Sequence, residues 1–230
     1  MKKNILLVVL FFTTLLLVLP ILSGKITKAN PLSSTTSERL PPLIAYWSFN
    51  EGTGNQVFDG TLNKNDGTIM GGAIWTTDSI FGTALKFDGI DDKIVIIKTS
   101  SVDATKKVTI EAFVKRVSNN DGMILSKNGP YYIAIRNDSL EAGVYANDGT
   151  GNKWTFVRGT TILDKNKWYN VKMVYDGNSI RIYLNSIFEG EINKKGTMPQ
   201  VSQQVHMGWG EPGQNQYFEG MLDEVRLYGE

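Results

Sequence analysis

The sequence predicts an all-β protein in which two antiparallel sheets pack face to face. From Leu43 onward, no long stretch has the 3.6-residue period of an amphipathic helix. Short runs rich in β-branched and aromatic residues recur instead, separated by Gly, Asn and Asp. Alternation is clearest where Ile180, Ile182 and Leu184 share one face of a run. Roughly a dozen short, half-buried, antiparallel strands of this kind are expected to stack as a sandwich.

The expected strands lie between residue 43 and the C-terminus, with turn residues between them. We expect them near 43–49, 84–88, 93–98, 107–116, 123–127, 130–136, 139–146, 153–158, 167–176, 179–185, 187–192, 203–209 and 220–228. The connections contain Asp-Gly and Asn-Asp pairs, which tolerate the positive φ that tight hairpins require.

The first 29 residues have the pattern of an export signal. Lys2 and Lys3 precede residues 5–22, a hydrophobic helix without a charge. The small-x-small pattern at 27–29 permits cleavage before Asn30. Alternatively the segment stays as a membrane anchor, since its length is near the lower limit for spanning a bilayer. Both alternatives place the remainder outside the cytoplasm, secreted or tethered by a single N-terminal span.

This pattern divides the chain into three segments. Residues 1–29 are the signal peptide or signal-anchor, and residues 30–42 form a polar linker rich in Ser, Thr and Pro. Residues 43–230 form the β domain. That length suits one sandwich better than two very small domains.

The composition excludes several classes of protein. Four of the 24 basic residues lie in the leader, which leaves 20 basic against 23 acidic residues and a net charge of −3. A nucleic-acid partner is therefore disfavoured, because it would need a basic surface. The chain has no cysteine, hence no disulfide and no thiolate site, and a single histidine, His206, makes a His-based triad hard to build.

Six segments, in order, resemble laminin-G-like domains of the concanavalin A-like lectin/glucanase type. They are 44–52; Asp59 with 65–68; 81–92, which contains Phe-Asp-Gly-x-Asp-Asp; 108–115; 168–177 with 180–185; and 220–228. The resemblance covers nearly all of 43–229 and implies a jelly-roll topology. It also implies a carbohydrate-binding or adhesive role, which is common among such domains in exported proteins.

The sequence departs from this family pattern at three positions. Phe113 stands where tryptophan is usual, and Lys93 stands where an aromatic residue often follows Asp-Asp. Ser186 replaces the glycine that usually follows Asn185. Lys93 would change a contact at the rim, and Ser186 would change a turn type. Neither of these two departures affects the core.

No catalytic site is expected. Glycosidic cleavage normally needs two carboxyl groups, and the Glu-x-Asp-x-(x)-Glu patterns of β-glucanases with this fold are absent. Glu141 stands alone on its strand, and the adjacent Asp223 and Glu224 point to opposite faces. His206 lies in a strand-like run and is interpreted as structural. A glycoside hydrolase or lyase is therefore the disfavoured alternative.

A structural Ca²⁺ is a further expectation, because domains similar to this one often hold such an ion near the chain termini. The predicted ligands are Asp59, Asn65, Asp66 and Asp223, since hard cations take carboxylate and carbonyl oxygens from turns. The alternative is that these residues only stabilise turns. The acidic run at 88–92 is interpreted as a turn that hydrogen-bonds its own backbone.

Aromatic side chains on one outer face predict a ligand surface. Sugar sites combine aromatic platforms with a few polar groups. The predicted ligand-binding residues are Tyr132, Arg136, Tyr145, Trp154 and Trp209, whereas Trp47, Phe87 and Trp168 are expected in the core. The alternative is that most of the surface aromatics are half-buried packing residues.

The sequence thus favours an exported, non-catalytic carbohydrate-binding or adhesive module at the cell surface. Its expected partner is a glycan or cell-surface polysaccharide. The alternative is a structural or protein-interaction component of an envelope or virion surface, attached to a membrane if the leader is retained.

Overall fold

The structure is a computed structural model that describes residues 41–97, 99–210 and 216–230. These residues belong to one compact unit, Arg39–Glu230. The expected leader helix, and all but the end of the expected linker, lie outside the described residues. Within the described part, no helix has the length and apolar character needed to cross a bilayer.

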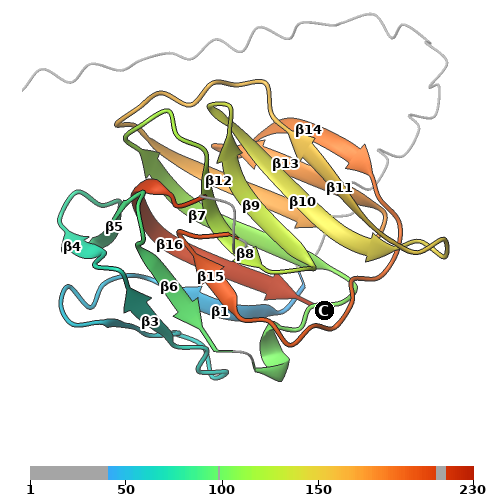
Figure 1. Ribbon diagram of the computed structural model, residues 1–230, viewed down its shortest axis with the longest axis horizontal. Helices are drawn as coiled ribbons and strands as arrows, with labels where there is room; N and C mark the ends of the chain where they lie inside the picture. The colour runs from blue at the N-terminus through green and yellow to red at the C-terminus, as the bar shows by residue number, and fades with distance from the viewer. Residues whose placement is uncertain (1–40, 98, 211–215) are drawn as a thin grey trace, which may run out of the picture. The chain divides into compact units, whose positions relative to one another are not determined.

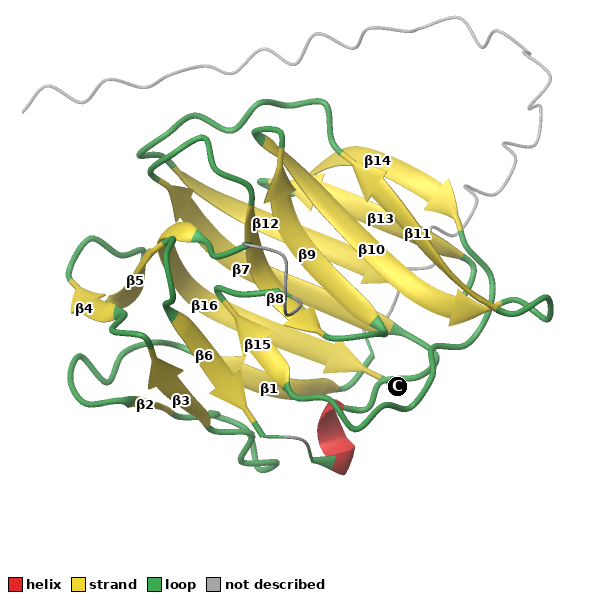
Figure 2. Cartoon of the chain, viewed as in Figure 1, coloured by secondary structure: helices red, strands yellow, loops and turns green. Residues whose placement is uncertain are grey.

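Two antiparallel sheets form the domain, as the sequence predicts (Figure 1). Sheet A contains, in order, β14 (Ile187–Asn193), β13 (Ser179–Leu184), β12 (Trp168–Tyr175), β7 (Val108–Arg116), β16 (Glu219–Gly229), β5 (Ala84–Asp88) and β4 (Ile74–Thr76), with β1 (Leu43–Trp47) also paired to β16. Sheet B contains β11 (Asn152–Arg158), β10 (Ser139–Asn147), β9 (Tyr131–Arg136), β8 (Gly122–Lys127), β15 (Val205–Met207), β6 (Lys93–Ile96), β3 (Gly67–Met70) and β2 (Gln56–Val57). Among the described residues the only helical element is the short turn η1 (Ser100–Val102) (Figure 2).

The two sheets lie face to face, with β10 and β11 of sheet B over β13 and β14 of sheet A (Figure 1). Inward side chains alternate with outward ones along each strand, so the core fills the space between the sheets. β12 shows the pattern: Tyr169, Val171, Met173 and Tyr175 are buried, and the residues between them are half-buried.

Every strand expected from the sequence is present, but three short strands were missed. These are β2, β3 and β4, which have two to four residues each. The equally short β6 and β15 lie within longer expected runs, whereas the segments of β2, β3 and β4 show no clear two-residue period, so only their pairing partners reveal them.

Two of the three expected core aromatics are buried as predicted. Trp47 and Phe87 are fully enclosed, and the Trp47 indole N–H donates to the carbonyl of Asn65 at 2.8 Å. The expectation for Trp168 is wrong. Trp168 precedes the inward Tyr169, so it lies on the outer face of sheet A, half-buried, with its indole N–H 3.2 Å from Asp78.

The tight turns have the predicted chemistry. The hairpin between β13 and β14 turns at Asn185 (φ 50°) and Ser186 (φ 66°), and that between β9 and β10 turns at Asn137 (φ 47°) and Asp138 (φ 66°). Two consecutive residues with positive φ match the right-handed twist of the flanking strands. Ser186 therefore adopts the positive φ that glycine tolerates most readily.

Candidate functional site

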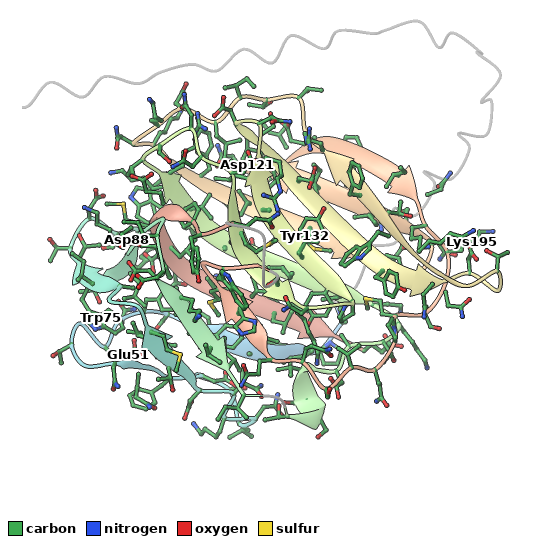
Figure 3. All side chains as sticks on the ribbon, in the orientation of Figure 1. Glu51, Trp75, Asp88, Asp121, Tyr132 and Lys195 are labelled. Atoms are coloured by element: carbon green, nitrogen blue, oxygen red, sulfur yellow. The ribbon has the colours of Figure 1, made fainter. Side chains whose placement is uncertain are left out.

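The outer face of sheet B carries the candidate site. Pairing registers place Phe156, Gly143, Tyr132, Ser126 and His206 opposite one another across β11, β10, β9, β8 and β15. On β9 the alternating neighbours Tyr131, Ile133 and Ile135 are buried in the core, so Tyr132 and Arg136 point outward. Figure 3 shows Tyr132 near the middle of this face, with Asp121 toward one end of β9.

A cavity of about 190 Å³ opens on this face. It is lined by Met123, Ser126, Lys127, Asn128, Gly129, Tyr131, Tyr132, Arg136, Trp154 and Gln216. Three of the five predicted ligand-binding residues, Tyr132, Arg136 and Trp154, thus line one cavity. The lining combines aromatic rings with amide, hydroxyl and guanidinium groups, a mixture typical of small-ligand sites.

Three aromatic rings form a cluster beside the cavity. The Trp154 ring centroid lies 5.5 Å from that of Tyr132 and 5.5 Å from that of Tyr145. Tyr145 and Trp154 face each other across the β10–β11 ladder. This pairing explains why Tyr145, which does not line the cavity, still belongs to the aromatic cluster. Trp154 is 43% exposed, so its ring is available for stacking.

Tyr132 is fixed in place by Gly143 and Glu141 of the neighbouring strand. The Tyr132 hydroxyl donates to a Glu141 carboxylate oxygen at 2.8 Å. Burial, and to a smaller extent the Glu141 charge, raises the pKa of Tyr132, so the hydroxyl stays protonated and remains a donor.

Both carboxylate oxygens of Glu141 accept hydrogen bonds within the domain. One accepts from Tyr132, and the other accepts from Arg158 Nε at 3.0 Å and Arg158 Nη2 at 2.5 Å. Glu141 is itself buried and is not among the residues that line the cavity, and none of those residues is an aspartate or a glutamate. Among the residues that the structure describes, the cavity lining therefore lacks the paired carboxyl groups that glycoside hydrolysis normally uses.

Trp209 does not line the cavity and lies in a separate cluster over β15 and β6. Its ring makes an edge contact with His206 at 4.7 Å, and Lys93 Nζ lies 4.8 Å from the ring centroid. Lys93, the departure from the family pattern, thus caps this ring with a cation. Burial, with a smaller contribution from Lys93, lowers the pKa of His206 to about 4.

The four predicted calcium ligands lie in two places. Asp59 accepts four hydrogen bonds, from the backbone N–H groups of Tyr46, Thr61 and Asn65 and from the Thr61 hydroxyl. Asp66 accepts from the Asp59 N–H, and Asn65 Oδ1 accepts from two hydroxyls, those of Thr99 and Ser101. These three residues organise the loop after β1.

Asp223 lies on β16, which pairs with β1 as the resemblance implies. Its Oδ2 accepts from the N–H groups of Ile80 and Phe81, and no described residue donates to its buried Oδ1. Burial raises the pKa of Asp223. The structure therefore shows intrachain partners for the predicted ligands, and calcium binding there stays a prediction.

The acidic run at 88–92 behaves as a self-bonded turn, as predicted. Asp88 accepts from the N–H groups of Ile90 and Asp91, and Asp92 accepts from the N–H of Asp88. Within the described ranges, Asp88, Asp91 and Asp92 are the group of acidic side chains close enough to share a cation. Figure 3 shows Asp88 well away from Tyr132.

Several cavity residues were not predicted from the sequence. Ser126, Asn128 and Gln216 line the cavity, and Gly143 supports it from below. The Asn128-Gly129 pair did carry a turn signal beside the expected aromatic strand. Gln216 lies outside the strands, and only the fold brings it to this face.

The domain is thus a jelly-roll sandwich with a cavity of aromatic and polar side chains on one outer face. The family model of the concanavalin A-like lectin/glucanases superfamily matches residues 88–230, and the chain belongs to this superfamily. A comparison with curated protein sequences found no match.

Solved structures share the fold. Domain 4 of AbnA, a GH43 extracellular arabinanase from Geobacillus stearothermophilus, in complex with arabinotriose, is similar over 83% of this chain and 94% of that chain, at 18% identity and a TM-score of 0.63. The binding domain of Paraclostridial Mosquitocidal Protein 1 is similar over 82% of this chain and 49% of that chain, at 12% identity and a TM-score of 0.67. The binding domain of Botulinum Neurotoxin DC in complex with SialylT is similar over 81% and 47%, at 14% identity and a TM-score of 0.62.

The chain spans about half the length of the two toxin binding domains. At these identities the likeness shows the fold alone.

Proposed function

We propose that this chain is an exported, non-catalytic carbohydrate-binding module at the cell surface, and that the cavity beside Trp154 and Tyr132 is its glycan site. The observation that carries the proposal is the exposed Trp154 ring, 5.5 Å from Tyr132, at the edge of a cavity lined with polar groups. Aromatic rings stack on the apolar faces of pyranoses, and polar groups around them fix the orientation.

The polar groups of the cavity support a sugar ligand. Asn128 Oδ1 is buried, and no described residue donates to it. An acceptor left without a donor is unfavourable, and a ligand hydroxyl would satisfy it. Ser126 and Arg136 line the same cavity and supply further hydrogen-bonding groups.

The binding-domain character of the similar structures supports a binding role over a catalytic one. One similar domain is described in complex with arabinotriose, which is a neutral oligosaccharide. The lone, fully engaged Glu141 gives the same indication, because it is already bonded to Tyr132 and Arg158. The hydrophobic leader is the support for export, since it provides a signal or an anchor.

A glycan array probed with the full-length chain, with and without Ca²⁺, tests the proposal. We expect selective binding that Trp154→Ala abolishes. Trp168→Ala is the matched control, since Trp168 lies on the outer face of the other sheet. A blank array under both conditions, or binding that survives Trp154→Ala, would overturn the assignment of this site.

A protein-interaction role is the second candidate, and one feature favours it. Edge strands β11 and β14 expose large apolar side chains: Phe156 is 56%, Ile187 68% and Phe188 55% exposed. Exposed apolar groups at sheet edges are typical of protein contacts. A blank glycan array together with loss of partner binding in Phe188→Ser would favour this role.

A further inference from the structure

We infer that the cavity selects a sugar that carries a carboxylate, a uronic acid, and that Arg136 is the residue that selects it. This inference rests on the proposed function and deepens it. Neither the family match nor the fold of the similar structures assigns a charge to the ligand of this chain.

Several N–H donors of Arg136 are not used in hydrogen bonds to the described residues. Among the described residues its guanidinium makes one hydrogen bond, from Nη2 to the neutral Oε1 of Gln216. A guanidinium has five N–H donors in a planar fork that matches a carboxylate. No nitrogen of Arg136 is a buried atom without a partner, and the side chain is 13% exposed, so its remaining donors keep contact with solvent.

The charge of Arg136 is only partly balanced within the protein. Carboxylate oxygens of Glu141 and Asp121 lie 3.8 Å from its nitrogens, within ion-pair range but beyond hydrogen-bond distance. Glu141 is already held by Arg158 at 2.5 Å. The Asp121 side chain is 44% exposed, so solvent screens its attraction for Arg136.

The rest of the lining leaves room for an anion beside Arg136. Among the described residues no acidic side chain lines the cavity, so a ligand carboxylate meets no like charge from them there. Lys127 also lines it, but its ammonium group bonds inside the protein, to Asp103 and to the Val102 carbonyl. Arg136 is therefore the cation that a bound ligand can reach.

The cavity brings together side chains that suit the two parts of such a ligand, its ring face and its carboxylate. Trp154 and Tyr132, which offer rings for stacking, line the same cavity of about 190 Å³ as Arg136. That volume suits a single sugar ring better than an extended chain. A uronic acid joins an apolar ring face and a carboxylate in one residue, which is the combination that these three side chains match.

Matched polysaccharides test the inference. The full-length chain is titrated with galacturonan and galactan, with glucuronan and β-glucan, and with dextran sulfate and dextran. We expect at least one uronan to bind about tenfold or more tightly than its neutral counterpart, the size typical of a charge-assisted hydrogen bond. We expect Arg136→Gln to reduce that preference to about twofold or less while neutral binding is kept, and Arg136→Lys to restore it in part.

Arg181→Gln is the control, because it makes the same change on the outer face of sheet A. The preference should survive it. Equal binding of uronan and neutral polymer, with both lost in Trp154→Ala, overturns the inference and leaves the proposed function standing. Dextran sulfate binding as tightly as the uronans overturns selection for a carboxylate. Binding of none of these polymers, together with a blank glycan array, overturns the proposed function itself.

Discussion

Tyr132 lies flat against Gly143, its direct partner across the β9–β10 ladder. A Cβ atom at position 143 would lie 2.4 Å from Tyr132 Cε1 and 2.9 Å from the Tyr132 hydroxyl oxygen. The glycine thus lets the ring lean along the sheet so that its hydroxyl reaches Glu141 at 2.8 Å. In this position the ring forms part of the cavity and contacts Trp154.

Gly143→Ala should therefore displace the Tyr132 ring and weaken both stability and glycan binding. We expect the free energy of unfolding to fall by about 1–3 kcal/mol, the usual penalty of overpacking. Chemical denaturation measures it. In the double variant Gly143→Ala/Tyr132→Ala the steric conflict is gone, so the two losses should be less than additive. Strict additivity would contradict the contact.

Ser186→Gly should stabilise the domain. Ser186 has φ 66°, a conformation that glycine adopts without strain. We expect a gain of about 0.5–1 kcal/mol, measured as a higher melting temperature.

Asp138→Gly provides the comparison, because Asp138 has the same φ of 66° in the other hairpin. Its carboxylate pairs with Arg116, whose side chain is 6% exposed. Removing it leaves a buried cation without its partner, so this variant should lower stability. A gain in both variants would show that the ion pair contributes little.

His206 should make the domain less stable in acid. Its folded pKa of about 4 is below the ordinary value of 6.5, so the unfolded chain binds the proton more readily. The contribution is therefore fully present above about pH 6.5 and is lost as the pH falls toward 4. Its maximum is on the order of 3 kcal/mol.

Melting temperatures from pH 7.5 to 4.5, compared between the native chain and His206→Phe, isolate this effect. The aromatic replacement keeps a neutral ring against Trp209 and does not titrate. We expect a smaller loss of stability in the variant over this range. Identical pH profiles would contradict the burial of His206.

The effect of calcium on stability can be measured separately from the effect of the hydrogen bonds that its predicted ligands accept. Asp59→Ala should lower stability by roughly 3 kcal/mol with or without the ion, because four donors lose their acceptor. Asp223→Ala should also lower the melting temperature. If calcium is bound there, EDTA lowers the melting temperature of the native chain and has no effect on Asp59→Ala. An unchanged native melting temperature in EDTA contradicts the site.

Most of the fold could be predicted from the sequence because the strands are long enough to show their period. β13, for example, alternates Ile180, Ile182 and Leu184 with outward residues and ends at an Asn-Ser turn. The sequence predicts that Trp168 lies in the core. The phase of β12, with Tyr169 inward, decides otherwise.

The sequence by itself determined the fold class, all the strands except β2, β3 and β4, and the outward direction of Tyr132, Arg136 and Trp154. These follow from local alternation, which each strand displays alone. Only the tertiary structure decided which outward side chains share a cavity. It joined Arg136 to Gln216, separated Trp209 from Trp154, and set Gly143 beneath Tyr132. Such neighbours depend on strand order and register, and these are fixed by the packing of the whole sandwich rather than by any single segment.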